Sequence, residues 1–321
     1  MSAQEWTGRP ERTVYSCSPD AVNALIRTRL ALLVSVLLAA CSGSGDASSQ
    51  GGGQAAIGAA STPSGPLLVA ADVGFAPHAM ARPDGSTEGF NVGLAAEIAD
   101  RLGRPGYQIV DQEFSGVFAG LNAGRFEFIV APITMTLERS RQVLFVEGYL
   151  DTDYTFVILD DAPDIESLDD IRGHAIAVNN GSVYDAWATE NTDRYDLEVQ
   201  RYGKNADAVQ AVLTGRVSAN LAGETAAKWA AMQSPLLRTT YTISTGAKFS
   251  AGFRHDDVEY RNRVEETIEC MKLDGTMAEL HEKWFGDPPA DGSAAVTVLE
   301  GYGEPGMLVV PSLRLSRIYP M

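Results

Sequence analysis

The sequence predicts an α/β protein built as two lobes. From Leu67 onward, short apolar runs typical of buried strands alternate with stretches whose apolar residues recur at helical spacing. The alternation restarts after residues 154–159, so two successive sets of strands and helices are present. The composition, 45% hydrophobic and 21% charged over 321 residues, suits one large or two medium globular domains. Since alternating strands and helices form parallel sheets covered on both faces, each set predicts one lobe.

The first set of elements follows from its apolar periodicity. Val92, Ala95, Ala99 and Leu102 fall on one helical face, which predicts an amphipathic helix. The apolar runs around it are short enough to be buried strands. The expected order is strand Leu67–Ala71, helix Val92–Leu102, strand Ile109–Asp111, a helix around Val117–Leu121 and strand Phe126–Ala131.

The second set has the same form and is followed by a helical end. We expect strands at Tyr154–Leu159, Ala175–Val178, Leu197–Tyr202, Val217–Ala222 and Phe249–Phe253. We expect helices at Tyr184–Thr189, Ala206–Leu213, Thr225–Met232, Val258–Leu273 and Thr276–Trp284. Ligands of such sheets bind outside the carboxyl ends of the strands, where helix N-termini converge. Functional residues are therefore expected there.

The N-terminus is typical of an exported lipoprotein. Two arginines precede an apolar run, residues 30–38, that is too short to span a bilayer as a mature helix. The run ends in Leu38-Ala39-Ala40-Cys41, which resembles a bacterial lipoprotein signal with cleavage before Cys41 and lipid added to its thiol. We expect a signal peptide and lipobox over residues 1–41. Residues 1–21 add nothing to an export signal, so we expect translation to start near Val22.

Two further segments lack a pattern of strands or helices. Residues 42–66 are rich in Gly, Ser, Ala and Gln and have hardly a large apolar side chain, so we expect a flexible tether. Residues 287–321 contain five prolines and little periodicity. We expect an extended C-terminal tail there.

Charge and motif content exclude several classes of function. A net charge of −17 argues against a nucleic-acid partner held by phosphate contacts. The four histidines are scattered without metal-ligand spacing, and no serine elbow, phosphate loop or cysteine–histidine pair stands out. We therefore expect no metal, no cofactor and no catalytic residue.

Arg139 stands where a purely structural arginine would be unusual. It follows a buried strand and Thr136, a good N-cap, in what we expect to be the first turn of a helix. A cation is mildly unfavourable there because of the helix dipole. Together with Thr134, Thr136 and free backbone amides, the guanidinium fork predicts an anion site. The alternative is that Arg139 only forms a surface salt bridge, as its neighbour Arg141 could.

The ordered motifs of residues 67–286 resemble the extracellular solute-binding proteins of family 3, the polar-amino-acid receptors of ABC importers. The motifs are Ala71-Asp72-Val73-Gly74-Phe75-Ala76-Pro77, Gly89-Phe90-Asn91-Val92-Gly93-Leu94, the run from Phe114 to Gly124, Thr134-Met135-Thr136-Leu137-Glu138-Arg139, Leu213-Thr214-Gly215-Arg216-Val217, Asp274-Gly275-Thr276 and Lys283-Trp284-Phe285-Gly286. The resemblance implies the type II periplasmic-binding-protein fold, with two doubly wound mixed sheets joined by two hinge strands. It puts one lobe at 67–152 plus 247–286 and the other at 153–246, with hinges near 153–156 and 245–249.

The resemblance also assigns roles at the ligand site. Arg139 would grip the ligand carboxylate with its planar fork, and Thr134 would add a hydrogen bond. Phe75 and Phe114 match positions that sandwich the aliphatic part of the ligand, although each could be plain core.

Two further residues carry weaker assignments. Asp72 matches a position that faces the ligand side chain, or else it caps the following turn. Ser182 matches a residue that donates to the ligand carboxylate, or else it is only the N-cap of the next helix.

The sequence departs from the family pattern at two positions. Pro132 replaces a residue whose backbone meets the ligand, and proline keeps the carbonyl but removes the N–H. Gly223 stands where an aspartate should pair with the ligand α-ammonium, and a desolvated ammonium without a counter-charge would be costly. Either Glu224 takes over, or the ligand is not a standard α-amino acid. A third possibility is that Glu224 only stabilises its helix N-terminus.

We expect a solute-binding lipoprotein that captures a small carboxylate-bearing solute, an amino acid or a derivative, and delivers it to an ABC permease and its ATPase. This chain has no Walker loop, so transport energy would come from the separate ATPase. We expect it to perform no chemistry and to be a monomer in the periplasm or on the outside of the cell envelope, anchored by lipid. One alternative is an exported enzyme resembling the cyclohexadienyl dehydratases, with Glu224 as general acid. Another is a sensory ligand-binding module.

Overall fold

The computed structural model describes residues 64–307. The expected signal peptide and lipobox, with Cys41, lie outside the described residues. So do the tether up to residue 63 and the end of the tail, residues 308–321. Within residues 64–307, none of the helices combines the length and apolar character that crossing a membrane requires.

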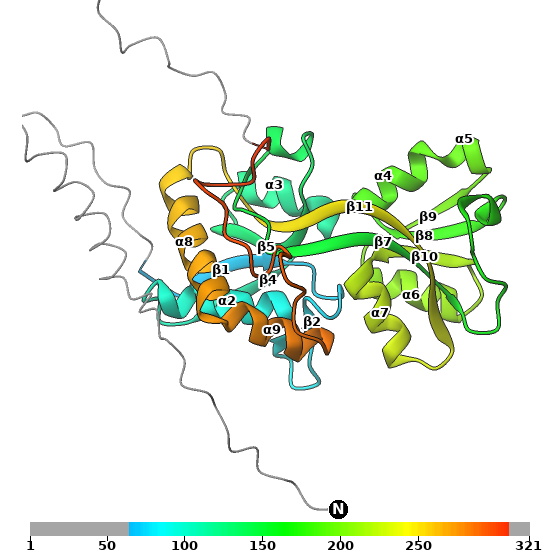
Figure 1. Ribbon diagram of the computed structural model, residues 1–321, viewed down its shortest axis with the longest axis horizontal. Coiled ribbons are helices and arrows are strands. Elements are labelled where there is room, and N and C mark those ends of the chain that lie inside the picture. The colour runs from blue at the N-terminus through cyan, green and yellow to red at the C-terminus, as the bar shows by residue number, and fades with distance from the viewer. Residues whose placement is uncertain (1–63, 308–321) are drawn as a thin grey trace, which may run out of the picture. The chain divides into compact units, whose positions relative to one another are not determined.

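In the described part of the chain, one nine-stranded sheet runs through the molecule in the order β4-β1-β5-β11-β7-β10-β8-β9, with β6 paired to β11 (Figure 1). A small hairpin of β2 and β3 lies apart from it. The strands are β1 (Leu67–Ala71), β2 (Met80–Ala81), β3 (Thr87–Glu88), β4 (Tyr107–Asp111), β5 (Phe128–Thr134), β6 (Leu144–Phe145), β7 (Leu150–Leu159), β8 (Ala175–Asn179), β9 (Glu198–Tyr202), β10 (Ala219–Gly223) and β11 (Leu237–Phe253).

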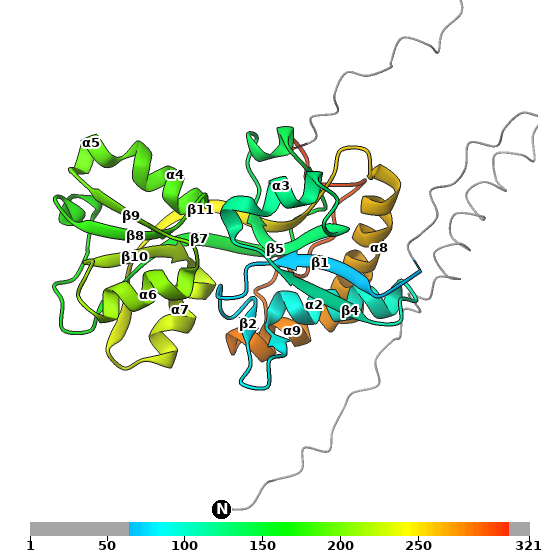
Figure 2. The ribbon, with the colours of Figure 1, turned by 180° about the vertical axis from the view of Figure 1, so that it is seen from behind.

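Helices cover both faces of this sheet. Helices α4 and α5 lie on one face of the β8–β9 region and α6 lies on the other (Figure 1, Figure 2). The α-helices are α2 (Phe90–Arg101), α3 (Val117–Asn122), α4 (Val183–Glu190), α5 (Thr192–Tyr195), α6 (Asn205–Leu213), α7 (Glu224–Gln233), α8 (Val258–Asp274) and α9 (Thr276–Phe285). The mixed α/β architecture with parallel β1–β4, β1–β5, β8–β9 and β8–β10 pairs confirms the predicted fold class.

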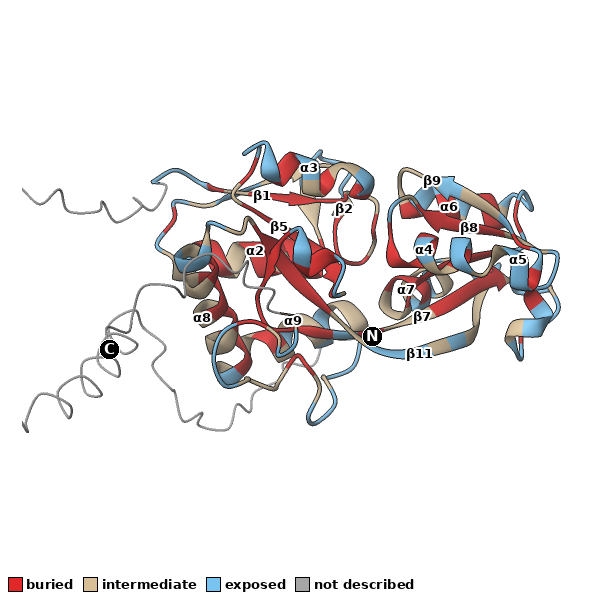
Figure 3. Ribbon diagram, turned by 90° about the horizontal axis from the view of Figure 1, so that it is seen from above, coloured by how far each residue is buried: buried red, intermediate tan, exposed pale blue. Residues whose placement is uncertain are grey.

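The hydrophobic core is divided into two regions along the chain. One cluster joins buried residues between 67 and 150 to residues between 249 and 295, and we call the part built on it lobe 1. Two smaller clusters join buried residues between 156 and 237, and we call the part built on them lobe 2. Phe75 is the exception, because it comes from lobe 1 and packs into a lobe 2 cluster. The buried strands of both lobes are visible in Figure 3.

Two long strands connect the lobes. β7 and β11 pair in antiparallel register, and that register shifts between Thr239 and Thr242 and again between Ile243 and Ala247. The middle of β11, around residues 244–246, is exposed, whereas its last five residues are buried. The two segments expected to act as hinges fall inside these strands. Irregular, solvated pairing is where a backbone can bend with few contacts to break.

The structure differs from the sequence prediction around Arg139. β5 continues beyond Ala131 to Thr134, so Pro132 lies inside a strand between two neighbours. A proline cannot donate to the ladder, and the β5–β11 register shifts opposite it, between Ser250 and Gly252. The predicted helix from Thr136 is wrong, because residues 139–141 form only a 3-10 turn. The Arg139 amide does donate to the Thr136 hydroxyl oxygen over 3.1 Å, as a capped turn would.

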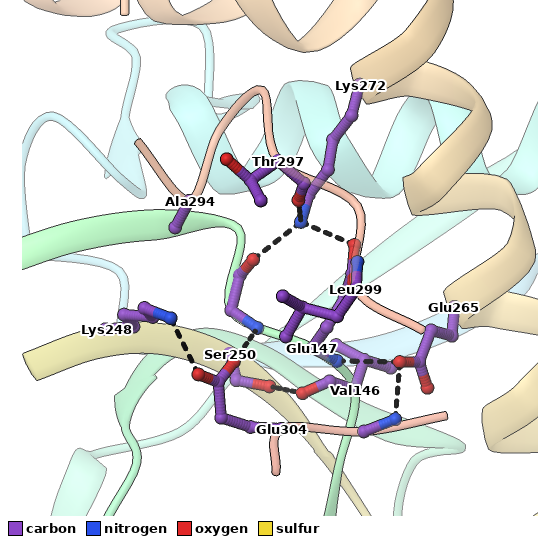
Figure 4. Close-up of polar contacts among 12 residues, drawn as sticks. Val146, Glu147, Lys248, Ser250, Glu265, Lys272, Ala294, Thr297, Leu299 and Glu304 are labelled. Atoms are coloured by element: carbon purple, nitrogen blue, oxygen red, sulfur yellow. Dashed lines mark hydrogen bonds and ion pairs between the residues drawn. The ribbon is translucent and has the colours of Figure 1, made fainter. Parts of the chain in front are cut away.

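The described part of the tail, residues 287–307, has no helix or strand and packs on lobe 1 (Figure 4). Its backbone supplies partners to buried charges. The Leu299 amide donates to Glu147 over 2.7 Å, and the Gly303 amide donates to Glu265 over 2.6 Å. Lys272 donates to Glu147 over 2.5 Å and to the Thr297 carbonyl over 2.8 Å. Because buried charges need such partners, this segment is part of the lobe 1 core.

Candidate functional site

A small cavity lies between the lobes at the carboxyl ends of β1, β5 and β8. Its volume is about 20 Å³, which is room for about one water molecule. Seven of the eight predicted ligand-binding residues line it, and Glu224 does not. The lining residues are Asp72, Phe75, Phe114, Ala131, Pro132, Thr134, Arg139, Asn179, Ser182, Val183 and Tyr184.

Arg139 brings a buried positive charge to this cavity. Its Nη1 donates to the Thr134 carbonyl over 3.0 Å, and its Nη2 donates to the Gly181 carbonyl of lobe 2 over 3.2 Å. The guanidinium carbon lies 5.1 Å from the centre of the Phe114 ring, a cation–π contact. Burial lowers the pKa of Arg139 to about 10.

Within residues 64–307, no carboxylate lies within ion-pair distance of Arg139. Two backbone carbonyls solvate the guanidinium but do not neutralise it. Arg139 is 8% exposed. A carboxylate is the group that fits its planar guanidinium, because it supplies the negative charge and can accept two parallel hydrogen bonds.

Asp72 is the acidic group on the cavity wall, and it already has a cation. The Lys204 ammonium of lobe 2 lies 3.0 Å from Asp72 and 2.5 Å from Asp111. Asn179 donates to Asp72 over 3.4 Å. The pKa of Asp72 is raised because burial penalises its charged form more than Lys204 stabilises it. Asp72 therefore contributes to an interlobe ion pair and is not a free anion.

Further hydrogen bonds hold the two lobes together around the cavity. The fully buried His78 of lobe 1 stacks on Phe75, with ring centroids 5.4 Å apart. Its Nε2 lies 2.8 Å from the Thr225 hydroxyl of lobe 2, and its Nδ1 lies 2.8 Å from Asn91. The Ala206 amide of lobe 2 donates to the Gly74 carbonyl over 3.0 Å. These contacts hold the two lobes in a closed arrangement.

Glu224 lies in a different pocket. This second pocket has a volume of about 330 Å³ and is formed by α7, α9, the start of β7 and the tail. Glu224 is the first residue of α7 and forms an ion pair of 2.5 Å with Lys228, one turn along the helix. It therefore does not share the cavity with Arg139. Ser182 does line the cavity, and its hydroxyl also accepts the Asp185 amide over 3.1 Å as the N-cap of α4.

Sequence reasoning assigned no role to Asn179 and Tyr184, although both line the cavity. Asn179 is the last residue of β8, and Tyr184 lies in the first turn of α4. The signal that could have identified them is their position, because ligands of α/β sheets bind at strand ends and helix starts.

A cluster of carboxylates in lobe 1 is close enough to ligate a metal, but it lies apart from Arg139. Oxygens of Glu147, Glu265 and Glu269 lie within 4.8 Å of one another, the one such group in residues 64–307. Glu147 already accepts from the Lys272 ammonium, and Glu265 from two backbone amides. We assign no metal to it.

Comparison with known proteins agrees with this fold. Residues 67–287 match the bacterial extracellular solute-binding proteins, family 3. The L-arginine-binding protein of Pseudomonas aeruginosa is 24% identical over 230 residues, which are 68% of this chain and 88% of that protein. An ancestral arginine-binding protein, solved bound to arginine, is 27% identical with a TM-score of 0.66, over 69% of this chain and 99% of the other.

One further solved structure bears on function. An ancestral amino acid-binding protein described as a precursor of cyclohexadienyl dehydratase is 28% identical with a TM-score of 0.64, over 69% of this chain and 96% of the other. The family match covers more than half of the chain. The protein therefore belongs to the bacterial extracellular solute-binding proteins of family 3, and its fold is the type II periplasmic binding fold.

Proposed function

We propose that this protein is the solute-binding lipoprotein of an ABC importer and captures a small carboxylate-bearing solute, an amino acid or a derivative. The observation that carries the proposal is Arg139, a buried guanidinium without a counter-charge in a cavity between two lobes. Thr134, Ser182 and Asn179 surround it with neutral hydrogen-bonding groups, and Phe75 and Phe114 supply apolar walls. Once the lobes open to admit a ligand, these groups can bind and orient a small anion.

Capture would occur by hinge closure. The lobes that would move are residues 67–152 plus 247–286 and residues 153–246, with bending in β7 and β11. Two observations support this motion: the pairing of β11 with β7 shifts in register, and hydrogen bonds join the two lobes in the closed arrangement. A ligand that contacts both lobes would favour the closed form because it binds that form better.

The experiment that tests the binding role compares two neighbouring arginines. Arg139→Lys should weaken binding of the captured carboxylate by about 2–5 kcal/mol, because an ammonium cannot reproduce two parallel hydrogen bonds. Arg139→Ala should weaken it at least as much. The exposed Arg141 is the matched control, and Arg141→Lys should bind as the unchanged protein does. Calorimetry against a solute library, preceded by native mass spectrometry for a co-purified ligand, would measure this, and tight binding by Arg139→Ala would refute the site.

The lipoprotein part of the proposal rests on the sequence before residue 42. If Cys41 carries lipid, Cys41→Ser should move the protein from the membrane fraction to the soluble fraction, since stable attachment requires more than one acyl chain. Fractionation followed by immunoblotting would measure this. A Cys41→Ser protein that still sediments with membranes would contradict the anchor and leave the binding role untouched.

An exported dehydratase on the same fold is the second candidate, and the similarity to the ancestral dehydratase precursor favours keeping it. Such an enzyme needs a proton donor beside the bound carboxylate. The predicted general acid, Glu224, lies outside the Arg139 cavity. Product analysis by mass spectrometry after incubation with the substrates of a cyclohexadienyl dehydratase would separate turnover from binding.

A further inference from the structure

The charges around the cavity leave one side of a zwitterionic ligand without a partner. Of the lining residues, the titratable ones are Asp72, Arg139 and Tyr184. A ligand carboxylate would neutralise Arg139. A ligand ammonium would need a free anion, and the buried Asp72 carboxylate is already in an ion pair with Lys204 at 3.0 Å, an ammonium that it shares with Asp111. A ligand ammonium would therefore have to compete with Lys204 for Asp72 in a desolvated cavity.

Two other acidic side chains near the lobe interface, Asp111 and Glu224, are also paired with lysines. Asp111 contacts the same Lys204 ammonium as Asp72 does. Glu224 lies in the second pocket, where it pairs with Lys228. The backbone position before Glu224 is Gly223, at the end of β10. A Cβ added there would lie 2.5 Å from the Tyr184 hydroxyl oxygen, 3.2 Å from Phe249 and 3.2 Å from the Thr152 hydroxyl oxygen. A carboxylate side chain therefore has no room at position 223 in this packing.

The Tyr184 hydroxyl occupies that space, and it is a neutral donor. Tyr184 is 3% exposed, and burial raises the pKa of its phenol. The nearby hydroxyls of Thr152 and Thr134 reduce the rise in the pKa of Tyr184. Neither hydroxyl forms a hydrogen bond with the Tyr184 oxygen, which has no hydrogen-bond partner among residues 64–307. A buried hydroxyl without a partner is costly, and a ligand oxygen would remove that cost.

We infer that the ligand is a carboxylate without an α-ammonium, such as a 2-hydroxy or 2-oxo acid, and that the Tyr184 hydroxyl donates to the oxygen on its α-carbon. This inference rests on the proposed function, since it assumes that Arg139 binds the carboxylate. It names the class of solute and makes Tyr184 the residue that selects it. Phe75 and Phe114 would contact the rest of the ligand.

The test uses matched sets of probes that differ only at the α-carbon. Lactate, 2-hydroxyisocaproate, phenyllactate and 2-oxoglutarate would be titrated calorimetrically against L-alanine, L-leucine, L-phenylalanine and L-glutamate. In the set whose side chain fits, the hydroxy or oxo acid should bind at least tenfold more tightly than the amino acid. The acid of the same carbon skeleton with no hydroxyl, oxo or amino group on its α-carbon, here called the unsubstituted acid, should bind more weakly than the hydroxy or oxo acid. It offers the Tyr184 hydroxyl no acceptor on the α-carbon.

Variants separate the role of Tyr184 from that of packing. Tyr184→Phe keeps the ring and should weaken binding of the hydroxy or oxo acid about tenfold, with little change for the unsubstituted acid. Tyr154→Phe is the control, because Tyr154 packs edge-on against Tyr184, with ring centroids 5.0 Å apart, but does not line the cavity. A purely structural role for Tyr184 would lower affinity for all probes equally and overturn its assignment.

Two outcomes distinguish this inference from the proposed function. If amino acids bind tenfold more tightly than their hydroxy and oxo analogues, and Arg139→Ala abolishes that binding, the inference is wrong and the binding role stands. If no probe binds, or if binding survives in Arg139→Ala, the proposed function itself fails, and the inference fails with it.

Discussion

Two buried cations in lobe 1, Lys272 and Arg139, have opposite surroundings. The Lys272 side chain is 1% exposed and lies 2.5 Å from the fully buried Glu147 carboxylate. The Gly148 and Thr297 carbonyls accept its other two protons (Figure 4). Arg139 is almost as buried, but its guanidinium contacts two carbonyls and the Phe114 and Phe118 rings and no carboxylate among residues 64–307. One cation is neutralised by a carboxylate of the protein, and the other has no carboxylate within ion-pair distance among residues 64–307.

This difference shows how a functional charge can be recognised in a core. A paired buried ion belongs to the packing, and its removal leaves its partner without a counter-charge. Removing an unpaired buried ion leaves no partner without a counter-charge, which is why we propose that Arg139 serves a ligand. The described part of the tail, residues 287–307, sharpens the contrast: its backbone completes the Lys272–Glu147 network, and no hydrogen bond joins it to Arg139.

The largest expected effect on stability comes from removing the paired cation. Lys272→Met should lower the free energy of unfolding by about 3–5 kcal/mol, because it leaves Glu147 buried without a cation. Arg139→Met is the matched comparison, and it should change stability by no more than about 1 kcal/mol because no buried anion loses its partner. Urea denaturation of both variants would measure this. Equal losses would show that the two cations do not differ as the structure indicates.

An intermediate effect on stability is expected from His78. It is a third buried basic group, and unlike Lys272 and Arg139 it is neutral. Complete burial lowers its pKa to about 4, below the ordinary value of 6.5. Between these pH values the unfolded chain binds a proton that the folded protein does not, so stability falls as the pH falls. The contribution of His78 should lower the free energy of unfolding by about 3 kcal/mol at pH 4 relative to neutral pH.

The His78 prediction is tested by comparing two pH profiles of the unfolding free energy. The glutamine in His78→Gln cannot titrate. Between pH 7 and pH 4 the free energy of unfolding of this variant should therefore fall by about 3 kcal/mol less than that of the unchanged protein. The His78–Thr225 bond joins the lobes, so acidification should also favour the open form. Parallel profiles for the two proteins would contradict the buried neutral imidazole.

The smallest effect is expected at Glu224, whose charge is half-exposed and paired. Glu224→Gln should lower stability by about 0.3–1 kcal/mol, because the carboxylate lies at the N-terminus of α7 beside Lys228. Ligand affinity should not change, because the side chain lies outside the Arg139 cavity. Calorimetry and thermal denaturation would check both. Loss of affinity for amino acids alone would make Glu224 the ammonium partner, and loss of product formation alone would make it a general acid.

Much of the fold could be predicted from the sequence, because strands and helices declare themselves through local periodicity. β1, α2, β8 and α6 fall within a few residues of their expected ranges. The stretch after Thr134 could not be predicted, since a good N-cap is only a local preference. Pairing of β5 with β11 extends that strand to Thr134, and only a 3-10 turn follows.

The site was predicted in outline and completed by tertiary contacts. Arg139, Thr134, Phe75 and Phe114 were identified from motifs and do line one cavity. Lys204 was not identified, because nothing near it in the sequence indicates that it neutralises an aspartate 132 positions earlier. The same holds for Tyr184, whose hydroxyl reaches Gly223 only in the folded lobe.

The sequence by itself determined the two sets of elements, the apolar cores and the presence of an arginine fork beside two threonines. These depend on residue type and spacing within a few turns of chain. The tertiary structure alone decided which charges are neutralised, because a counter-ion is chosen by distance in space and by burial. Lys272 meets Glu147 from 125 positions away, and Arg139 meets no carboxylate among residues 64–307. Coulombic pairing acts through space and leaves no periodic signal in the sequence, whereas hydrophobic burial does.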